Sequence, residues 1–110
     1  MSYNVAVWEG PRPINNSAAG VEFDRLMDVA EAQDAPPTPR IVAFVKALLA
    51  VWPDGDGASP WALEPMRDAC GPIVFLGVRF DDAAGALPLI AGTAHRRGLV
   101  CFDPQVHRLL

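Results

Sequence analysis

The residues that could support acid–base or nucleophilic chemistry are a few titratable side chains near the two ends of the chain: Glu9, His95, Cys101 and Asp103. A cysteine beside a histidine base can act as a nucleophile. However, Cys101 lies between two apolar residues in a predicted strand, where burial keeps a thiol protonated. We therefore assign no catalytic residue and expect no cofactor. A small enzyme or ligand-binding domain, with these four residues lining a cleft at the strand ends, remains an alternative.

Three possible metal ligands, Cys101, Asp103 and His107, fall close together near the end of the sequence. They form neither a His-x-x-x-His pair nor a Cys-x-x-Cys pair, the spacings typical of zinc sites. Asp54 and Asp56 resemble the start of a calcium-binding loop, but the residues directly after them supply no further carboxylate. The sequence therefore predicts no metal site.

Length and composition limit the class of protein. The 110 residues suffice for a single domain, residues 1–110, and 51% of them are hydrophobic. With nine basic and thirteen acidic residues the net charge is −4, which argues against nucleic-acid binding because that depends on neutralising phosphates. No apolar stretch reaches the roughly 18–20 residues needed to cross a bilayer, and Met1–Asn4 does not resemble a signal peptide. We expect a cytoplasmic protein that binds no membrane.

Acidic residues and tryptophan suggest a protein-binding surface. Six of the thirteen acids precede residue 36, where there are only two bases. Trp61 follows a proline in a predicted loop, and tryptophan is enriched at the energetically important positions of interfaces. An acidic surface attracts basic partners, because complementary fields speed their encounter. The predicted partner-binding residues are Trp61, Asp54, Asp56 and Glu64 in the loop, and Glu22 and Asp28 on the first helix.

Apolar spacing and proline positions predict the elements that hold these residues. In order they are a strand (3–8), a helix (18–33), a helix (39–52), a long loop (53–72), a strand (73–80), a helix (81–97) and a short strand (99–102). Helices between strands favour an α/β (α+β) fold. We expect a small two-layer sandwich of three to four strands, the fourth formed by the long loop, with the helices mainly on one face.

The strand at 73–80 is apolar on both sides. Val74, Leu76, Val78 and Phe80 would point one way, and the alternate residues, such as Phe75, the other. An uncovered row of this kind would leave a sticky patch of several hundred Å². Either the loop, a helix on the far face or a second subunit must cover it, and the last possibility makes a structural homodimer another alternative function.

Four segments carry a resemblance to a family: Val5–Gly10 (VAVWEG), Thr38–Ile41 (TPRI), Ser59–Ala62 (SPWA) and Gly98–Gln105 (GLVCFDPQ). Together they resemble a small uncharacterised bacterial protein family, along nearly the whole chain. The resemblance implies one domain and carries over no activity or site residue. Small acidic bacterial domains also include immunity proteins that neutralise a basic toxin. We therefore expect a non-enzymatic cytosolic protein-binding domain, with an immunity-like role as the class analogy.

Overall fold

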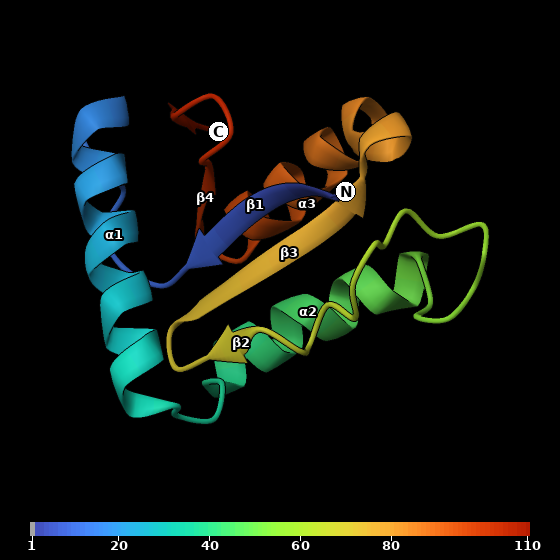
Figure 1. Ribbon diagram of the computed structural model, residues 1–110, viewed down its shortest axis with the longest axis horizontal. Helices are drawn as coiled ribbons and strands as arrows, with labels where there is room; N and C mark the ends of the chain where they lie inside the picture. Colours follow the sequence, from blue (N-terminus) through green and yellow to red (C-terminus); the bar gives the residue numbers. More distant parts are fainter. Residues whose placement is uncertain (1) are drawn as a thin grey trace.

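The sheet at the centre of the molecule is built around β1 (Ser2–Trp8), its middle strand. A computed structural model describes residues 2–110 (Figure 1). Over these residues the sheet has five strands in the order β2-β3-β1-β4-β5, and neighbouring strands are antiparallel. The remaining elements are α1 (Asn16–Gln33), α2 (Pro39–Val51), β2 (Ala69–Cys70), β3 (Ile73–Arg79), the 3-10 helix η1 (Phe80–Asp82), α3 (Ala83–Arg96), β4 (Val100–Asp103) and β5 (Arg108–Leu109).

The register places β3 and β4 on the two sides of β1. Val5 lies opposite Leu76 in β3, and Ala6 lies opposite Phe102 in β4. Because both strands are antiparallel to β1, they are parallel to each other. A parallel pair needs a crossover connection, and α3 provides it, passing behind β1 in the view of Figure 1.

Local capping residues define the helix ends. The amide of Ala18 donates to Oδ1 of Asn15 over 2.8 Å at the start of α1. Thr38 caps α2, and Pro39 occupies its first turn, where a missing amide proton costs nothing. Gly98, with φ +69°, provides the left-handed turn that ends α3 and leads into β4.

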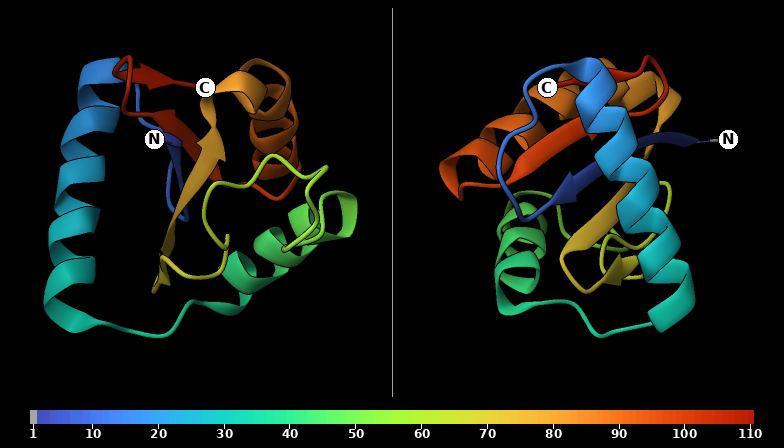
Figure 2. Two further views of the ribbon diagram at one scale, coloured as in Figure 1. Left: turned by 45° about the vertical axis from the view of Figure 1, so that its right-hand side comes forward. Right: turned by 90° about the vertical axis from the view of Figure 1, so that its left-hand side faces the viewer.

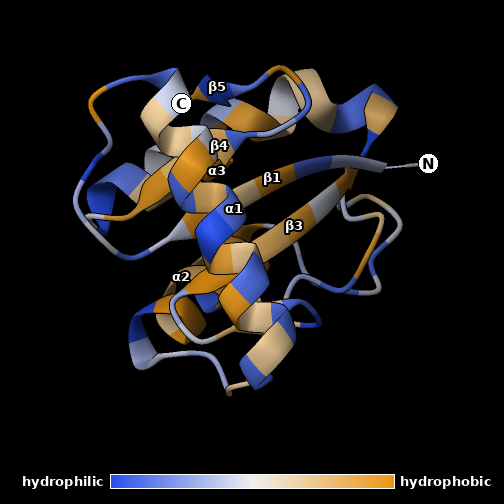
Figure 3. Cartoon of the chain, turned by 60° about the vertical axis from the view of Figure 1, so that its left-hand side comes forward, coloured by the Kyte–Doolittle hydropathy of each residue, from blue (hydrophilic) through white to orange (hydrophobic). Residues whose placement is uncertain are grey.

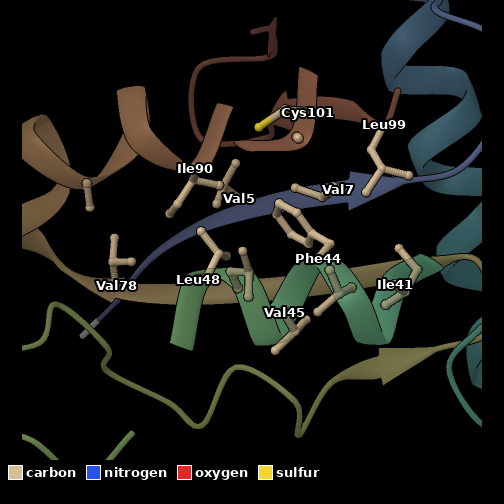
Figure 4. Close-up of a cluster of buried hydrophobic side chains, with 14 of the residues drawn as sticks. Val5, Val7, Ile41, Phe44, Val45, Leu48, Val78, Ile90, Leu99 and Cys101 are labelled. Atoms are coloured by element: carbon tan, nitrogen blue, oxygen red, sulfur yellow. The ribbon is translucent and has the colours of Figure 1, made fainter. Parts of the chain in front are cut away.

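The helices cover both faces of the sheet, and Figure 2 shows α1 on one side with α2 and α3 on the other. The α2–α3 side holds the larger core, where Val5, Val7 and Cys101 meet Phe44 and Ile90 (Figure 4). The α1 side holds a smaller cluster of apolar residues: Ala6, Trp8, Ala19, Leu26, Ile73, Val100 and Phe102. The α+β class is confirmed, and α1 adds cover on the second face to the expected two-layer arrangement.

The prediction that β3 is hidden on both sides is confirmed. Val74, Leu76 and Val78 lie in the larger core, while Ile73 belongs to the cluster under α1. Two of the three possible covers are present: α1 covers the far face, and Trp61 of the loop packs in the larger core with this row, so β3 does not require a second subunit. Phe80 is an exception: it lies in η1 beyond the strand and is 46% exposed.

The strand count differs from the expected three to four because two short strands form at the edges. The fourth strand expected from the long loop is β2, which pairs with β3 across the turn at Gly71 and Pro72. The residues after β4 fold back as β5. Each of these edge strands has two residues, too few to produce an alternating pattern. Among residues 2–110, no helix combines the length and apolar character that a bilayer crossing requires.

Candidate functional site

The candidate site is a cleft of about 370 Å³ between the C-terminal half of α1 and the β2–β3 hairpin, which we call the α1–hairpin cleft. Apolar side chains line it from both sides: Met27 from α1, and Ile73 and Phe75 from β3. Ile73 is buried, and the other two are half-buried. Displacing water from this apolar floor is favourable, so a ligand with an apolar group would bind there more tightly.

Charged side chains surround this floor. Glu31 and Asp34 come from the last turn and C-cap of α1, and Asp68 comes from the turn before β2; we call these three carboxylates the acidic rim. Arg67 is the single basic residue among those that line the cleft. All four are exposed, so the mouth of the cleft carries an excess of negative charge in contact with solvent.

The position of α1, and with it the shape of the cleft, depends on Phe23. Its ring lies 5.5 Å from that of Phe102, 5.9 Å from that of Phe75 and 6.4 Å from that of Trp8, measured between centroids. Near the start of the helix, Gly20 approaches His107 so closely that a Cβ there would lie 2.3 Å from the imidazole. Figure 3 shows hydrophobic and hydrophilic segments alternating along α1, as expected for a helix with one face on the sheet.

The hairpin side of the cleft is held by backbone hydrogen bonds. The amide of Gly71 donates to the carbonyls of Ala35 and Pro36, each over 3.2 Å, and the amide of Thr38 donates back to the Gly71 carbonyl over 3.0 Å. Gly71 has φ +54°, a left-handed conformation that residues with a side chain rarely adopt. The turn of the hairpin is therefore tied to the segment that joins α1 to α2.

The prediction that Trp61 is presented to a partner is wrong. Its side chain is only 9% exposed, its Nε1 donates to the Trp52 carbonyl over 2.8 Å, and the two indoles meet edge to face. The chain around it closes the outer edge of β3: the amide of Ala62 donates to Gly77, and that of Arg79 to Pro60. The edge of β3 has backbone groups that need hydrogen-bond partners, and the loop residues that supply them bring Trp61 into the core.

The predicted acidic residues do not form one surface. Asp54 and Asp56 are exposed in the loop that follows α2, whereas Glu22 and Asp28 belong to α1, which covers the other face of the sheet (Figure 2). Asp56 has a local role, accepting a hydrogen bond from the Ala58 amide. Glu64 is exposed in the turn before β2, where its carbonyl accepts a hydrogen bond from the Arg67 amide.

Glu22 also forms a local contact. Its carboxylate accepts two hydrogen bonds from Arg25, at 2.6 and 2.9 Å, across one turn of α1. These bonds lower the pKa of Glu22, so it stays ionised and paired. The charge of Glu22 is therefore largely balanced within the helix.

The four residues of the alternative cleft are not brought together. Glu9 accepts a hydrogen bond from the Thr38 hydroxyl and contacts Arg40 at 3.4 Å, joining the end of β1 to the start of α2. Phe102 lies opposite Ala6 in the antiparallel pair, so the next residue, Asp103, lies opposite Val5. Val5 is about four residues from Glu9, which is roughly 13 Å along β1. His95 is exposed at the end of α3, with Nε2 3.1 Å from the Leu110 carbonyl oxygen.

Cys101 has the environment expected of a structural thiol. Its side chain is fully buried in the larger core, and burial, with the nearby Asp103 carboxylate, raises its pKa to about 12. A thiol with this pKa is protonated at neutral pH and is a poor nucleophile. In residues 2–110 no three His, Cys, Asp or Glu side chains gather into a metal-binding group.

A buried pair that the sequence reasoning missed joins β1 to the end of β4. The Tyr3 hydroxyl donates to Oδ2 of Asp103 over 2.5 Å, and the amide of Gln105 donates to Oδ1 over 2.9 Å. The hydrogen bond to Asp103, together with burial, raises the pKa of Tyr3 and keeps the hydroxyl protonated. Tyr3 and Asp103 share a face of the sheet only because of the register of β1 and β4, which no local pattern reveals.

Replacing Tyr3 with phenylalanine should destabilise the protein by about 1–2 kcal/mol at neutral pH, because the buried Asp103 carboxylate loses its side-chain donor. The ring would keep its edge-to-face contact with Phe80. Urea unfolding of Tyr3→Phe and the parent protein gives the difference. A change below about 0.3 kcal/mol would mean that Asp103 finds another donor of equal strength.

Comparison with known proteins gives no family from which to assign this site. No protein-family model matches the chain, and no curated protein or solved structure matches it either. The resemblance to a bacterial family carried by VAVWEG and GLVCFDPQ stays a prediction. The α1–hairpin cleft is therefore the feature of the molecule from which a function can be inferred.

Proposed function

We propose that this protein is a non-enzymatic, cytosolic binding domain whose α1–hairpin cleft accepts a basic segment of a partner protein. The observation that supports this role is the composition of the cleft: an apolar floor surrounded by the three carboxylates of the acidic rim and a single guanidinium. Apolar area contributes affinity, and complementary charge contributes association rate and selectivity.

The charge of α1 supports the same partner class. Between residues 16 and 34 there are five acids, Glu22, Asp24, Asp28, Glu31 and Asp34, and one base, Arg25. The field of such a helix would attract a basic protein over about a Debye length, roughly 8–10 Å at physiological salt. The acidic rim lies at the C-terminal end of this helix, next to the cleft.

The binding role accounts for the residues better than either alternative. For the enzyme alternative, Cys101 is protonated in the core, and Glu9 and Asp103 are already hydrogen-bonded in separate places. For the homodimer alternative, the second face of the sheet is already covered by α1. Neither alternative makes use of the α1–hairpin cleft.

A peptide titration with a charge-matched control tests the proposal. The probe is an acetylated, amidated peptide of alternating arginine and alanine, followed by fluorescence anisotropy. The rim variant Glu31→Gln/Asp34→Asn/Asp68→Asn should weaken binding by at least about tenfold, and raising salt should weaken binding to the parent protein. Asparagine at position 34 tolerates the left-handed conformation of Asp34, φ 45°.

The control variant Asp54→Asn/Asp56→Asn/Asp81→Asn removes the same number of charges from exposed positions in the loop after α2 and in η1, none of which line the cleft. Asparagine at position 56 keeps an acceptor for the Ala58 amide. This variant should change the affinity by less than about threefold. Equal losses in the two variants would show that net charge alone attracts the peptide, and the proposal would be rejected; the absence of any binding to the parent protein would reject it as well.

A further inference from the structure

A second, smaller cavity of about 50 Å³ opens beside the α1–hairpin cleft, and we call it the apolar pocket. Ala30, Cys70 and Ile73 line both cavities, so a ligand in the cleft lies directly against the pocket. The other residues of the pocket are mostly apolar: Leu26, Val29, Ala35 and Pro72. Gly71 and the uncharged Gln33 complete the lining, and none of residues 2–110 places a charged side chain there.

The size and lining of the apolar pocket define the group that it can hold. An apolar cavity of about 150 Å³ is enough for a benzene ring, so about a third of that volume has room for one or two methyl groups at the end of an aliphatic side chain. A polar group there would lose its water without gaining enough partners, which disfavours it. The pocket therefore selects for an aliphatic group.

Two of the three carboxylates of the acidic rim lie within one residue of this pocket along the chain. Glu31 follows Ala30, which lines both cavities, and Asp34 precedes Ala35, which lines the pocket. A ligand that places an aliphatic group in the pocket thus presents its neighbouring groups to carboxylates. From this juxtaposition we infer that the cleft recognises a peptide segment in which an aliphatic residue, such as leucine, is flanked by arginine or lysine. The inference rests on the proposed function and specifies its ligand.

Two peptides of equal charge test the inference. Both are acetylated and amidated and contain either Arg-Leu-Arg or Arg-Ser-Arg between glycines, so that they differ only in the side chain meant for the pocket. The parent protein should bind the leucine peptide at least about fivefold more tightly, because only leucine has methyl groups that can enter the apolar pocket.

A pocket-filling variant locates the effect. Ala35→Leu enlarges a side chain that lines the apolar pocket but not the cleft, so it should bring the two affinities within about twofold of each other. The matched control is Ala50→Leu, the same change at an exposed position of α2 on the other side of the sheet. This control should keep the preference for the leucine peptide. Thermal unfolding establishes that both variants are folded.

A measurement on the parent protein keeps the inference testable if Ala35→Leu does not fold. With the leucine peptide isotopically labelled, nuclear Overhauser contacts should join the leucine methyl groups to Ala30 and Ile73. Equal affinity for the two peptides, or leucine contacts elsewhere, would overturn the inference and leave the proposed function intact. If neither peptide binds, both the inference and the proposed function fail.

Discussion

The free energy of unfolding is expected to fall by up to about 4 kcal/mol between pH 9 and pH 12, mainly because of Cys101. Burial raises the pKa of this thiol from 9.0 to about 12 in the folded protein. Below pH 9 the thiol is protonated in both the folded and the unfolded state, so the free energy of unfolding has its full value with respect to this group. Above pH 9 the unfolded chain loses the proton while the folded protein keeps it, so unfolding becomes easier by about 1.4 kcal/mol per pH unit until the folded thiol also ionises.

Urea unfolding at a series of pH values from about 8 to 10.5 measures this dependence. The variant Cys101→Ala should have a smaller slope above pH 9, whereas Val7→Ala, which truncates the buried residue opposite Cys101 and removes no ionisable group, should retain the parental slope. Tyr3 adds a separate loss above pH 10, since its pKa is also raised in the folded protein, and Tyr3→Phe removes that contribution. A parental slope in Cys101→Ala would assign the alkaline sensitivity to other groups.

Replacing Phe23 with alanine should cost about 3 kcal/mol and free α1 from the sheet. Its ring is the common neighbour of Trp8, Phe75 and Phe102, so its removal leaves a cavity beneath the middle of the helix. Since α1 forms one wall of the α1–hairpin cleft, peptide binding should be lost together with the packing of the helix.

Urea unfolding together with amide hydrogen exchange separates a local effect from a global one. In Phe23→Ala, amides between residues 24 and 33 should exchange faster than those of α2, because the larger core on the other face is untouched. The matched control is Val21→Ala, which removes apolar atoms from the same helix at a side chain that is 72% exposed and should change stability by less than about 0.5 kcal/mol. Retained protection after residue 23 would show that other contacts suffice to hold α1.

The main helices and strands were predictable because their signals are local. Thr38 followed by Pro39 begins α2 as expected, and the apolar spacing predicts a helix that ends one residue later than the observed Val51. For α1 the predicted end at residue 33 is confirmed, while the helix, capped by Asn15, begins at Asn16, two residues earlier than expected. Caps, prolines and hydrophobic periodicity act over a few residues, so they can be read without knowing the rest of the fold.

The candidate site could not be predicted in the same way. Glu31 and Asp34 are more than thirty residues from Arg67 and Asp68 in the sequence, and they come together because the β2–β3 hairpin lies beside α1. The first strand of the hairpin has only two residues, so no alternating pattern in the sequence predicts its pairing with β3. Trp61 likewise has the sequence context of a presented loop residue, but the open edge of β3 buries it.

The α+β class, the doubly hidden strand β3, the protonated thiol of Cys101 and the excess of acid near α1 could all be predicted from the amino-acid sequence. Each of these follows from the type of a residue and its immediate neighbours. In contrast, the face that α1 covers, the carboxylates that share a cleft and the burial of Trp61 depend on how the chain folds in three dimensions. These depend on strand register and on contacts between distant segments, where a shift of one residue moves a side chain to the opposite face of the sheet.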